Sequence, residues 1–310
     1  MEYRTLGKTD LKVSILGFGG ATLGDVYGTL DPAEGERAVH AAIDQGINYF
    51  DVAPYYGLTL AEERLGQYLE GRRDKVILSS KCCRYGLDDF DFSAKRVEQS
   101  IDESLKRLRT DYLDLYIVHD VEFGDRRQVI EEAVPAARRV QQSGKARYVG
   151  ISGLPPRFLR SVAAEAPVDV ILSYCHYNLL VDDLDTVLRP FAEEQGIGLI
   201  NASPLHMGIL SDGGPQPWHP APPEVKEVGR KIGELCKKRR MSPASVGLAF
   251  CLAYPHVATT LVGTSDRHQL EQNLRALTLR PEPGLMKMIS TLVAPVKNKT
   301  WPSGRPENQE

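Results

Sequence analysis

The sequence predicts an α/β protein with the fold of a (β/α)8 TIM barrel, and two observations lead to this prediction. Short apolar runs alternate along the chain with longer amphipathic stretches, the pattern of repeated βαβ units. The runs are apolar at most positions, as expected of parallel strands buried on both faces. Eight such runs favour a closed barrel over an open doubly wound sheet. The runs are Ile15–Phe18, Asn48–Val52, Val76–Ser80, Leu113–Val118, Tyr148–Ile151, Val170–Tyr174, Leu199–Ala202 and Thr260–Val262.

The stretches between the runs carry residues that are typical of helix ends. Asp31-Pro32 and Ser242-Pro243 each place an N-cap residue before a proline at the first helical position. Ser93 is the expected N-cap of a long helix whose apolar residues recur at steps of three and four. Gly46 and Gly196 follow expected helix ends. These signals divide the chain into the alternating elements that a barrel needs.

Two segments lie outside the repeat. Residues 1–14 predict a β-hairpin, with Tyr3–Leu6 paired to Leu11–Ser14, which we expect to cover the lower end of the barrel. Residues 206–224 predict a long loop after the seventh strand, rich in glycine and proline. Long loops in compact domains are usually functional or disordered, and a tryptophan and two histidines favour function here. No linker is visible, so residues 1–310 are predicted to form one domain.

Composition and charge argue against several classes of protein. The 42% apolar and 25% charged residues are ordinary for a globular protein, and a net charge of −3 suggests no nucleic-acid partner. No run of about 18 apolar residues occurs, so the sequence does not suggest a membrane span. The N-terminal residues lack the layout of a signal peptide, so we expect a cytoplasmic protein. Five cysteines without metal-like spacing suggest reduced thiols and no metal site.

Polar residues follow three adjacent predicted strands at their carboxyl ends, where TIM barrels place their active sites. The second strand runs into Asp51 and Tyr56, the third ends at Lys81 and the fourth ends at His119. Hydride transfer to a carbonyl carbon leaves an alkoxide that needs a proton, and the reverse reaction needs a base. The sequence therefore predicts a site for coupled hydride and proton transfer.

Each of the four side chains suits one role in this chemistry. Tyr56 is the acid/base. Its ordinary pKa is near 10, and a neighbouring ammonium group lowers that pKa. Lys81 is that ammonium, and Asp51 keeps it charged and in place. His119 donates a hydrogen bond that orients the carbonyl. Taken singly, Lys81 and Asp51 are more often a structural ion pair, but four matches at predicted strand ends favour catalysis.

The motifs around these residues resemble the aldo-keto reductase superfamily. The matching segments are Gly46–Gly57, Ser79–Lys81 and Asp111–His119, together with Leu6–Thr9 of the hairpin. The resemblance covers essentially the whole chain. It implies that the four side chains are the Asp, Tyr, Lys and His of the family's catalytic tetrad, and that the cofactor is a nicotinamide dinucleotide.

The resemblance also implies a nicotinamide site, with departures from the family pattern. Ser152 matches the first member of a Ser-Asn pair that holds the carboxamide, whereas Gly153 has no side chain to replace the Asn. Tyr174 stands where the family often has Gln. Ser203 and Leu205 lie in a segment that often supplies a Tyr to stack on the nicotinamide ring. That stacking group is therefore missing or comes from elsewhere in the chain.

The segment from Leu261 to Asn273 resembles the family region that binds the adenosine phosphate. NADPH-dependent members carry a Lys and an Arg where this chain has Gly263 and Gln269, which favours NAD over NADP. NADP remains possible because Arg267 is nearby. The contacts expected here are Gly263, Thr264, Ser265, Gln269, Gln272 and Asn273.

Four further segments resemble the branch of the superfamily that contains L-galactose dehydrogenase and aldose 1-dehydrogenase. They are His119–Phe123, Ser173–Tyr177, Pro217–Pro222 and Pro295–Trp301. The resemblance implies NAD-dependent oxidation of a free aldose, such as L-galactose or L-fucose, at C1 to the aldonolactone. A polyol site needs hydrogen-bonding groups, and a sugar also stacks on aromatic rings. The candidates are Tyr85, Asp120, His176, Trp218 and His219, although His176 and Tyr174 are explained equally well as packing residues.

Two other functions stay open from the sequence. One is an NADPH-dependent reductase of aldehydes or ketones, which the missing phosphate-binding cations disfavour. The other is a nucleotide-sensing regulatory subunit with the same fold, which the complete tetrad disfavours. We expect a monomer that acts on a small sugar, without a nucleic-acid or membrane partner.

Overall fold

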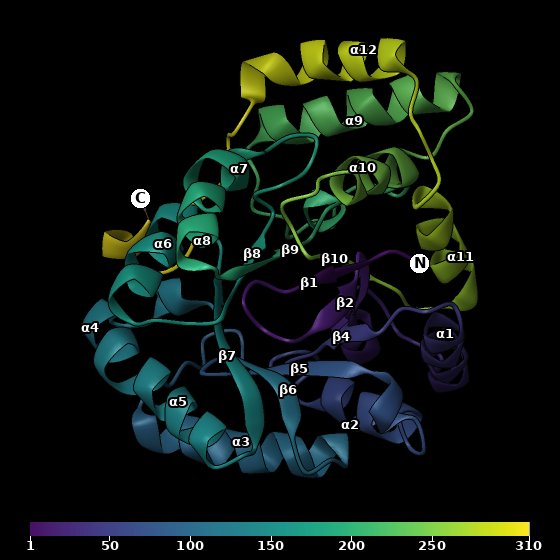
Figure 1. The fold of residues 1–310 in the computed structure, drawn as a ribbon. Coiled ribbons are helices and arrows are strands. Elements are labelled where there is room, and N and C mark those ends of the chain that lie inside the picture. The colour runs from purple at the N-terminus through teal and green to yellow at the C-terminus, as the bar shows by residue number, and fades with distance from the viewer. Residues whose placement is uncertain (310) are drawn as a thin grey trace.

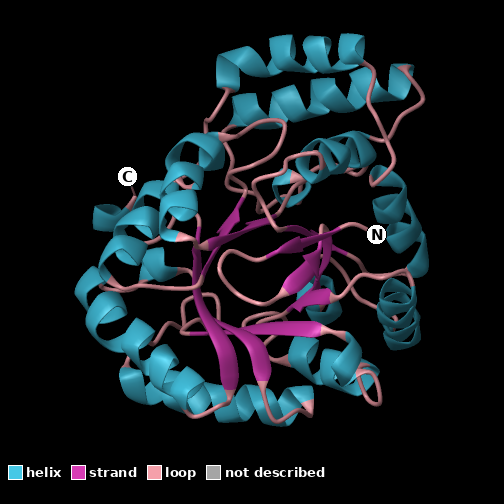
Figure 2. Ribbon diagram, viewed as in Figure 1, coloured by secondary structure: helices cyan, strands magenta, loops and turns pink. Residues whose placement is uncertain are grey.

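The computed structural model describes residues 1–309, and its centre is a closed barrel of parallel strands surrounded by helices (Figure 1, Figure 2). Around the barrel the order is β10-β3-β4-β5-β6-β7-β8-β9. Each predicted apolar run forms one of these strands, so the predicted (β/α)8 barrel is confirmed. The barrel strands are β3 (Leu16–Gly19), β4 (Tyr49–Asp51), β5 (Ile77–Cys82), β6 (Leu113–Val118), β7 (Ala146–Gly153), β8 (Val170–Tyr174), β9 (Gly198–Ala202) and β10 (Thr259–Gly263).

The helices pack against the outside of the barrel, and their termini follow the predicted capping signals (Figure 2). The side chains of Asp31, Ser93 and Ser242 each accept a hydrogen bond from a backbone N–H in the first turn of their helices. Gly196 ends its helix in the left-handed conformation. The helices are α1 (Pro32–Asp44), α2 (Leu60–Tyr68), α3 (Ala94–Leu108), α4 (Arg126–Gln128), α5 (Val134–Gln142), α6 (Pro156–Glu165), α7 (Asp183–Val187), α8 (Arg189–Gln195), α9 (Pro223–Lys238), α10 (Pro243–Leu252), α11 (Arg267–Ala276) and α12 (Pro283–Val293).

The predicted N-terminal hairpin is present and closes one end of the barrel (Figure 1). It consists of β1 (Tyr3–Thr5) and β2 (Lys12–Ser14), which pair antiparallel. Its apolar residues Leu6, Leu11 and Val13 are buried in one cluster with inward-facing side chains of the barrel strands. The hairpin therefore completes the core that the strands alone would leave open to water.

The long loop after β9 is also present, between a short turn at His206–Gly208 and the start of α9. Beyond it, α9 and α12 pack against each other outside the ring of helices (Figure 1). The sequence analysis does not predict α12. Its buried residues Leu285, Ile289 and Val293 recur at steps of four and join the cluster that contains α9 and Trp301.

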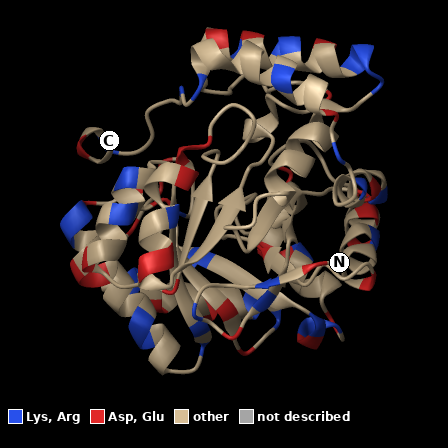
Figure 3. Cartoon of the chain, turned by 45° about the horizontal axis from the view of Figure 1, so that its top comes forward, with Lys and Arg blue, Asp and Glu red and all other residues tan. Residues whose placement is uncertain are grey.

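Charged side chains of both signs are interspersed over the outer helices (Figure 3). Many form exposed pairs, such as Arg230 with Glu227 and Glu234 on α9. Exposed pairs of this kind contribute little to stability and mainly keep the surface hydrated. None of the helices in residues 1–309 is both long enough and apolar enough to cross a membrane.

The hairpin makes a testable contribution to stability through Gly7. Its φ is +58°, and a Cβ on it would lie 2.3 Å from the backbone nitrogen of Gly198. Gly71 has a similar φ of +71° but open space around it. We expect Gly7→Ala to lower the free energy of unfolding by about 3 kcal/mol and Gly71→Ala by about 1 kcal/mol. Urea denaturation measures both, and equal losses would contradict close packing of the hairpin.

Candidate active site

The register of the barrel brings the four predicted side chains to one mouth. Asp51 at the end of β4 pairs with Ser79 on β5, and Lys81 lies two residues further along that strand. Lys81 in turn pairs with Ile117 on β6, and the N–H of His119 donates to the carbonyl of Cys82 just beyond. Asp51, Lys81 and His119 therefore occupy the carboxyl ends of three adjacent strands.

Lys81 is the centre of a buried hydrogen-bond network. Its Nζ donates to the carboxylate of Asp51 in a very short contact, to the carbonyl of Val52 at 2.9 Å and to the hydroxyl of Tyr56 at 3.3 Å. These three partners use all the protons of the ammonium. The hydroxyl of Ser79 donates to the second carboxylate oxygen of Asp51 at 2.9 Å. The network directs a fixed positive charge at the phenol.

Tyr56 reaches this network because the turn after β4 is tightly packed. Gly57 has a φ of +63°, and a Cβ there would lie 2.2 Å from the carbonyl oxygen of Gly24. Only glycine fits both the conformation and the close approach. The turn thereby places Tyr56 over the barrel mouth, 5.9 Å from His119 between ring centroids and perpendicular to it.

Burial sets the protonation states of both rings. Burial lowers the pKa of His119 to about 3. The negative charge of Asp120 opposes this lowering, and the positive charges of Lys81 and Arg84 add to it. His119 is therefore neutral at pH 7 and keeps one N–H to donate. Burial raises the pKa of Tyr56 well above its usual value, with Asp51 and Asp120 adding to the effect and Arg84 opposing it.

The pKa of Tyr56 is shifted upward, which is opposite to the lowering expected from the sequence. The phenol loses more of its contact with water than a sequence can reveal, and the negative charges of Asp51 and Asp120 raise its pKa further. The protein's own groups therefore hold Tyr56 as a neutral phenol, which is the proton-donating form.

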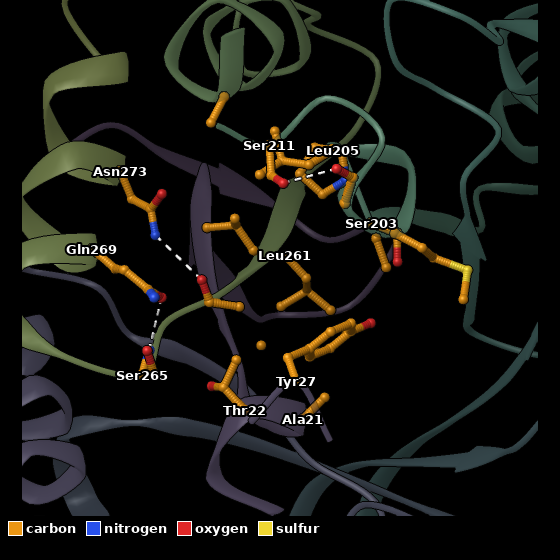
Figure 4. A pocket seen from close by; sticks show the side chains of 18 of the residues that line it. Ala21, Thr22, Tyr27, Ser203, Leu205, Ser211, Leu261, Ser265, Gln269 and Asn273 are labelled. Atoms are coloured by element: carbon orange, nitrogen blue, oxygen red, sulfur yellow. Dashed lines mark hydrogen bonds between the residues drawn. The ribbon is translucent and has the colours of Figure 1, made fainter. Parts of the chain in front are cut away.

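A cavity of about 520 Å³ runs from Asp51 and Tyr56 to α11 (Figure 4). Seven predicted cofactor residues line it: Ser203, Leu205, Gly263, Ser265, Gln269, Gln272 and Asn273. The sequence analysis missed Thr22 and Tyr27, which follow β3 and also line the cavity (Figure 4). Nothing in the local sequence marks them, because their position depends on the closure of β3 against β10.

Three predicted cofactor residues do not line the cavity. The hydroxyl of Ser152 accepts from the N–H of Asp120 at 3.3 Å, and that of Thr264 accepts from Asn273 at 3.1 Å. The hydroxyl of Tyr174 donates to Glu122 at 3.2 Å.

Of the predicted sugar-binding residues, Asp120 and Trp218 lie near the cavity and Tyr85 does not. Asp120 follows His119 directly, and Trp218 is half exposed with its ring 6.3 Å from that of Tyr27. The hydroxyl of Tyr85 accepts from the N–H of Cys83, and its ring lies under Arg96 of α3. Tyr85 therefore faces the outer helices and does not line this cavity.

His176 and His219 are also buried behind the mouth rather than in the cavity. His176 contacts Asp183 at 2.6 Å, and His219 contacts the carbonyl of His206 at 3.0 Å. The rings of His206 and His219 both pack edge-on against Trp301. The cluster of His206, His219 and Trp301 links the loop after β9 to the C-terminal segment, and neither His176 nor His219 lines the cavity.

A buried acid explains the unusual glycine after Ser152. Glu122 is fully buried, and its carboxylate accepts from the N–H of Leu154 and the hydroxyls of Tyr174 and Ser303. A Cβ on Gly153 would lie 2.4 Å from the other carboxylate oxygen of Glu122. The carboxylate thus occupies the space that an Asn side chain would need.

The shape and lining of the cavity fit an extended dinucleotide. One end meets the tetrad and the other meets α11, while Gly19, Gly20 and Ala21 leave room for close approach. A buried Tyr–Lys–Asp network beside such a cavity supplies the proton that hydride transfer requires. The fold and the site together define an NAD(P)-dependent oxidoreductase.

Comparisons with known proteins give the same class. The profile of the Aldo/keto reductase family matches residues 15–292. L-galactose dehydrogenase of Arabidopsis thaliana is 42% identical over 99% of both chains. D-threo-aldose 1-dehydrogenase of a Pseudomonas species is 30% identical over 89% of this chain and 92% of its own. The holo form of an aldo-keto reductase from Bacillus halodurans superposes with a TM-score of 0.79 at 27% identity, covering both chains fully. The chain belongs to the aldo/keto reductase family.

Glu122 makes the stability of the protein depend on pH. Burial, with the charge of Asp120, raises the pKa of Glu122 to about 8, above its unfolded value of 4.5. The contribution of the protonated form to stability is therefore complete below about pH 4.5 and declines as the pH rises through about 8. The decline is at most about 1.4 kcal/mol per pH unit.

Glu122→Gln keeps the shape of the side chain but removes the group that titrates. We therefore expect this variant to lose the part of the decline in unfolding free energy that Glu122 causes as the pH rises. Urea denaturation of the wild type and of Glu122→Gln between pH 6 and pH 9 measures the effect. Parallel stability curves for the two proteins would contradict the buried, protonated state of Glu122.

Proposed function

We propose that the protein is an NAD-dependent dehydrogenase that oxidises a free aldose at C1 to the aldonolactone. The observation that carries the proposal is the 3.3 Å contact from Nζ of Lys81 to the hydroxyl of Tyr56, held by the buried carboxylate of Asp51. Tyr56, Lys81, Asp51 and His119 act as the catalytic tetrad. The alternatives are an NADPH-dependent aldehyde or ketone reductase and a nucleotide-sensing subunit.

In the proposed reaction, C1 of the cyclic sugar loses a hydride and its hydroxyl loses a proton. Oxidised nicotinamide, held by the residues that line the cavity, would supply the hydride acceptor and a positive charge. The protein's own groups favour the neutral phenol of Tyr56, so the positive charge of the cofactor, together with Arg84, whose charge lowers the pKa of Tyr56, would favour the phenolate that takes the proton from the C1 hydroxyl. Neutral His119 donates a hydrogen bond to the same oxygen. The carbon becomes the carbonyl of an ester, because the ring oxygen is already bonded to it.

The residues around the adenosine end support NAD over NADP. Gly263 and Gln269 line the cavity without positive charge. The carboxylate of Asp266 accepts from the N–H of Gln269 at 2.9 Å, so a negative charge occupies the start of α11. A phosphate dianion placed there would meet this carboxylate, whereas a free ribose hydroxyl would not. Arg267 is largely exposed and lies 3.4 Å from Glu271.

The relatives support a sugar substrate. L-galactose dehydrogenase and D-threo-aldose 1-dehydrogenase are both named for aldoses. Half-exposed Trp218 beside the cavity offers an apolar ring face on which a sugar can stack. We further propose that the chain acts as a monomer in the cytosol, and its five buried free cysteines are compatible with a reducing compartment.

The test is the rate of NADH formation with a panel of L- and D-aldoses, each offered with NAD and with NADP. We expect turnover of L-galactose, L-fucose or a close stereochemical relative with NAD, at a kcat/KM at least about tenfold above that with NADP. Simple aldehydes with NADPH are the control reaction. Consumption of NADPH on those aldehydes, with no aldose oxidised, would contradict the proposal and favour the reductase.

A further inference from the structure

An ion pair that the tetrad does not include lies directly beside it. Arg84 follows β5 and Asp120 follows β6, and Nη1 of Arg84 donates to Oδ2 of Asp120 at 2.5 Å. The side chains are 13% and 4% exposed. The same Asp120 oxygen lies 3.6 Å from Nε2 of His119. The pair therefore adjoins the group that orients the reacting oxygen.

Aromatic rings fix the orientation of the guanidinium. Arg84 lies 3.9 Å above the ring centroid of Tyr55, and the centroids of Phe90 and Phe123 are 5.1 and 5.3 Å away. Phe90 and Phe123 stack on each other at 4.4 Å. A guanidinium held on several rings has little freedom to turn, so its remaining N–H groups point in set directions.

The pair keeps hydrogen-bonding capacity that the protein does not use. Oδ1 of Asp120 is buried and has no partner within residues 1–309. Arg84 donates from Nη1 to Asp120 and from Nε to the carbonyl of Gly86, which leaves Nη2 without a partner in the same residues. A buried acceptor without a donor costs about 1–3 kcal/mol, more when it is charged. The pair thus presents one free acceptor and one free donor.

Stability alone does not account for this arrangement. Buried ion pairs contribute little to stability compared with apolar residues of similar volume. Asp120 also has a φ of +48°, a strained conformation for a residue other than glycine. An unsatisfied buried acceptor at the edge of an active site is a feature that a substrate contact resolves.

We propose that Arg84 and Asp120 bind the hydroxyl on the carbon next to the reacting carbon, which is C2 of the aldose. The proposal rests on the proposed function. A hydroxyl satisfies both free groups, because it donates to Oδ1 of Asp120 and accepts from Nη2 of Arg84. The ring oxygen of a sugar cannot do so, since it has no proton to donate. The pair therefore selects 2-hydroxy aldoses over aldehydes without that hydroxyl.

The experiment compares kcat/KM for the best aldose of the panel and for its 2-deoxy analogue. The variants are Asp120→Ala, which removes the acceptor, and Arg84→Met, which keeps the apolar stem. Arg96→Met is the matched control: Arg96 also lies 3.9 Å over a tyrosine ring and pairs with a carboxylate, but on the outer helix α3. Thermal unfolding and the Kd for NAD establish that each variant is folded and binds cofactor.

We expect the wild type and Arg96→Met to prefer the aldose over the 2-deoxy analogue by about 100-fold or more. Asp120→Ala and Arg84→Met should lose at least about tenfold more in kcat/KM on the aldose than on the analogue, so the preference collapses whatever the variants do to the rate common to both substrates. If Arg84→Met does not fold, Arg84→Lys replaces it in the experiment. Lysine has one nitrogen in place of Nη1 and Nη2, so the preference for the aldose over the 2-deoxy analogue should fall at least about tenfold.

Two results overturn the proposal and are distinguishable. Variants that oxidise the aldose with the wild-type preference would show that the pair does not bind the C2 hydroxyl, while the proposed function stands. A wild type that oxidises no aldose with either dinucleotide would overturn the proposed function and this proposal with it.

Discussion

The candidate site depends on one buried ion pair, between Asp51 and Lys81. Two charges away from water are costly unless they are paired and fully hydrogen-bonded, and here they are both. Ser79 and the carbonyl of Val52 complete the pair, and the one remaining ammonium proton has Tyr56 as its partner. The position of the phenol therefore depends on the network that allows the barrel to bury a lysine.

Around this pair, the barrel supplies fixed positions and the loops supply recognition. Strand ends carry Asp51, Lys81 and His119, whose places are set by the register of neighbouring strands. The segments after β5 and β6 bring together Arg84 and Asp120, which are 36 positions apart in the chain. Rigid strands thus serve the proton transfer common to the family, while the loop pair serves the choice of substrate that we propose.

The sequence predicted what local patterns determine. Apolar runs located the strands and capping residues located several helices, among them α1, α3 and α10, because each signal lies within a few residues. The strand-end pattern likewise anticipated that Asp51, Lys81 and His119 lie at one mouth of the barrel. Arg84, Glu122 and Tyr27 were not predicted, since each is defined by partners distant in the chain. The place of Tyr85 against Arg96 of α3 was not visible in the sequence for a related reason, because no local pattern marks the φ of +76° at Cys83, two residues earlier.

The measurement that tests the central claim most directly is single-turnover hydride transfer in Lys81→Met, with the aldose that the wild type oxidises best. The account predicts a rate reduced by at least about 1000-fold, because Tyr56 loses its adjacent ammonium, with the Kd for NAD changed by less than about threefold. The variant should also unfold more readily, since Asp51 is left unpaired. A folded variant that transfers hydride within about tenfold of the wild-type rate would contradict the role assigned to the pair.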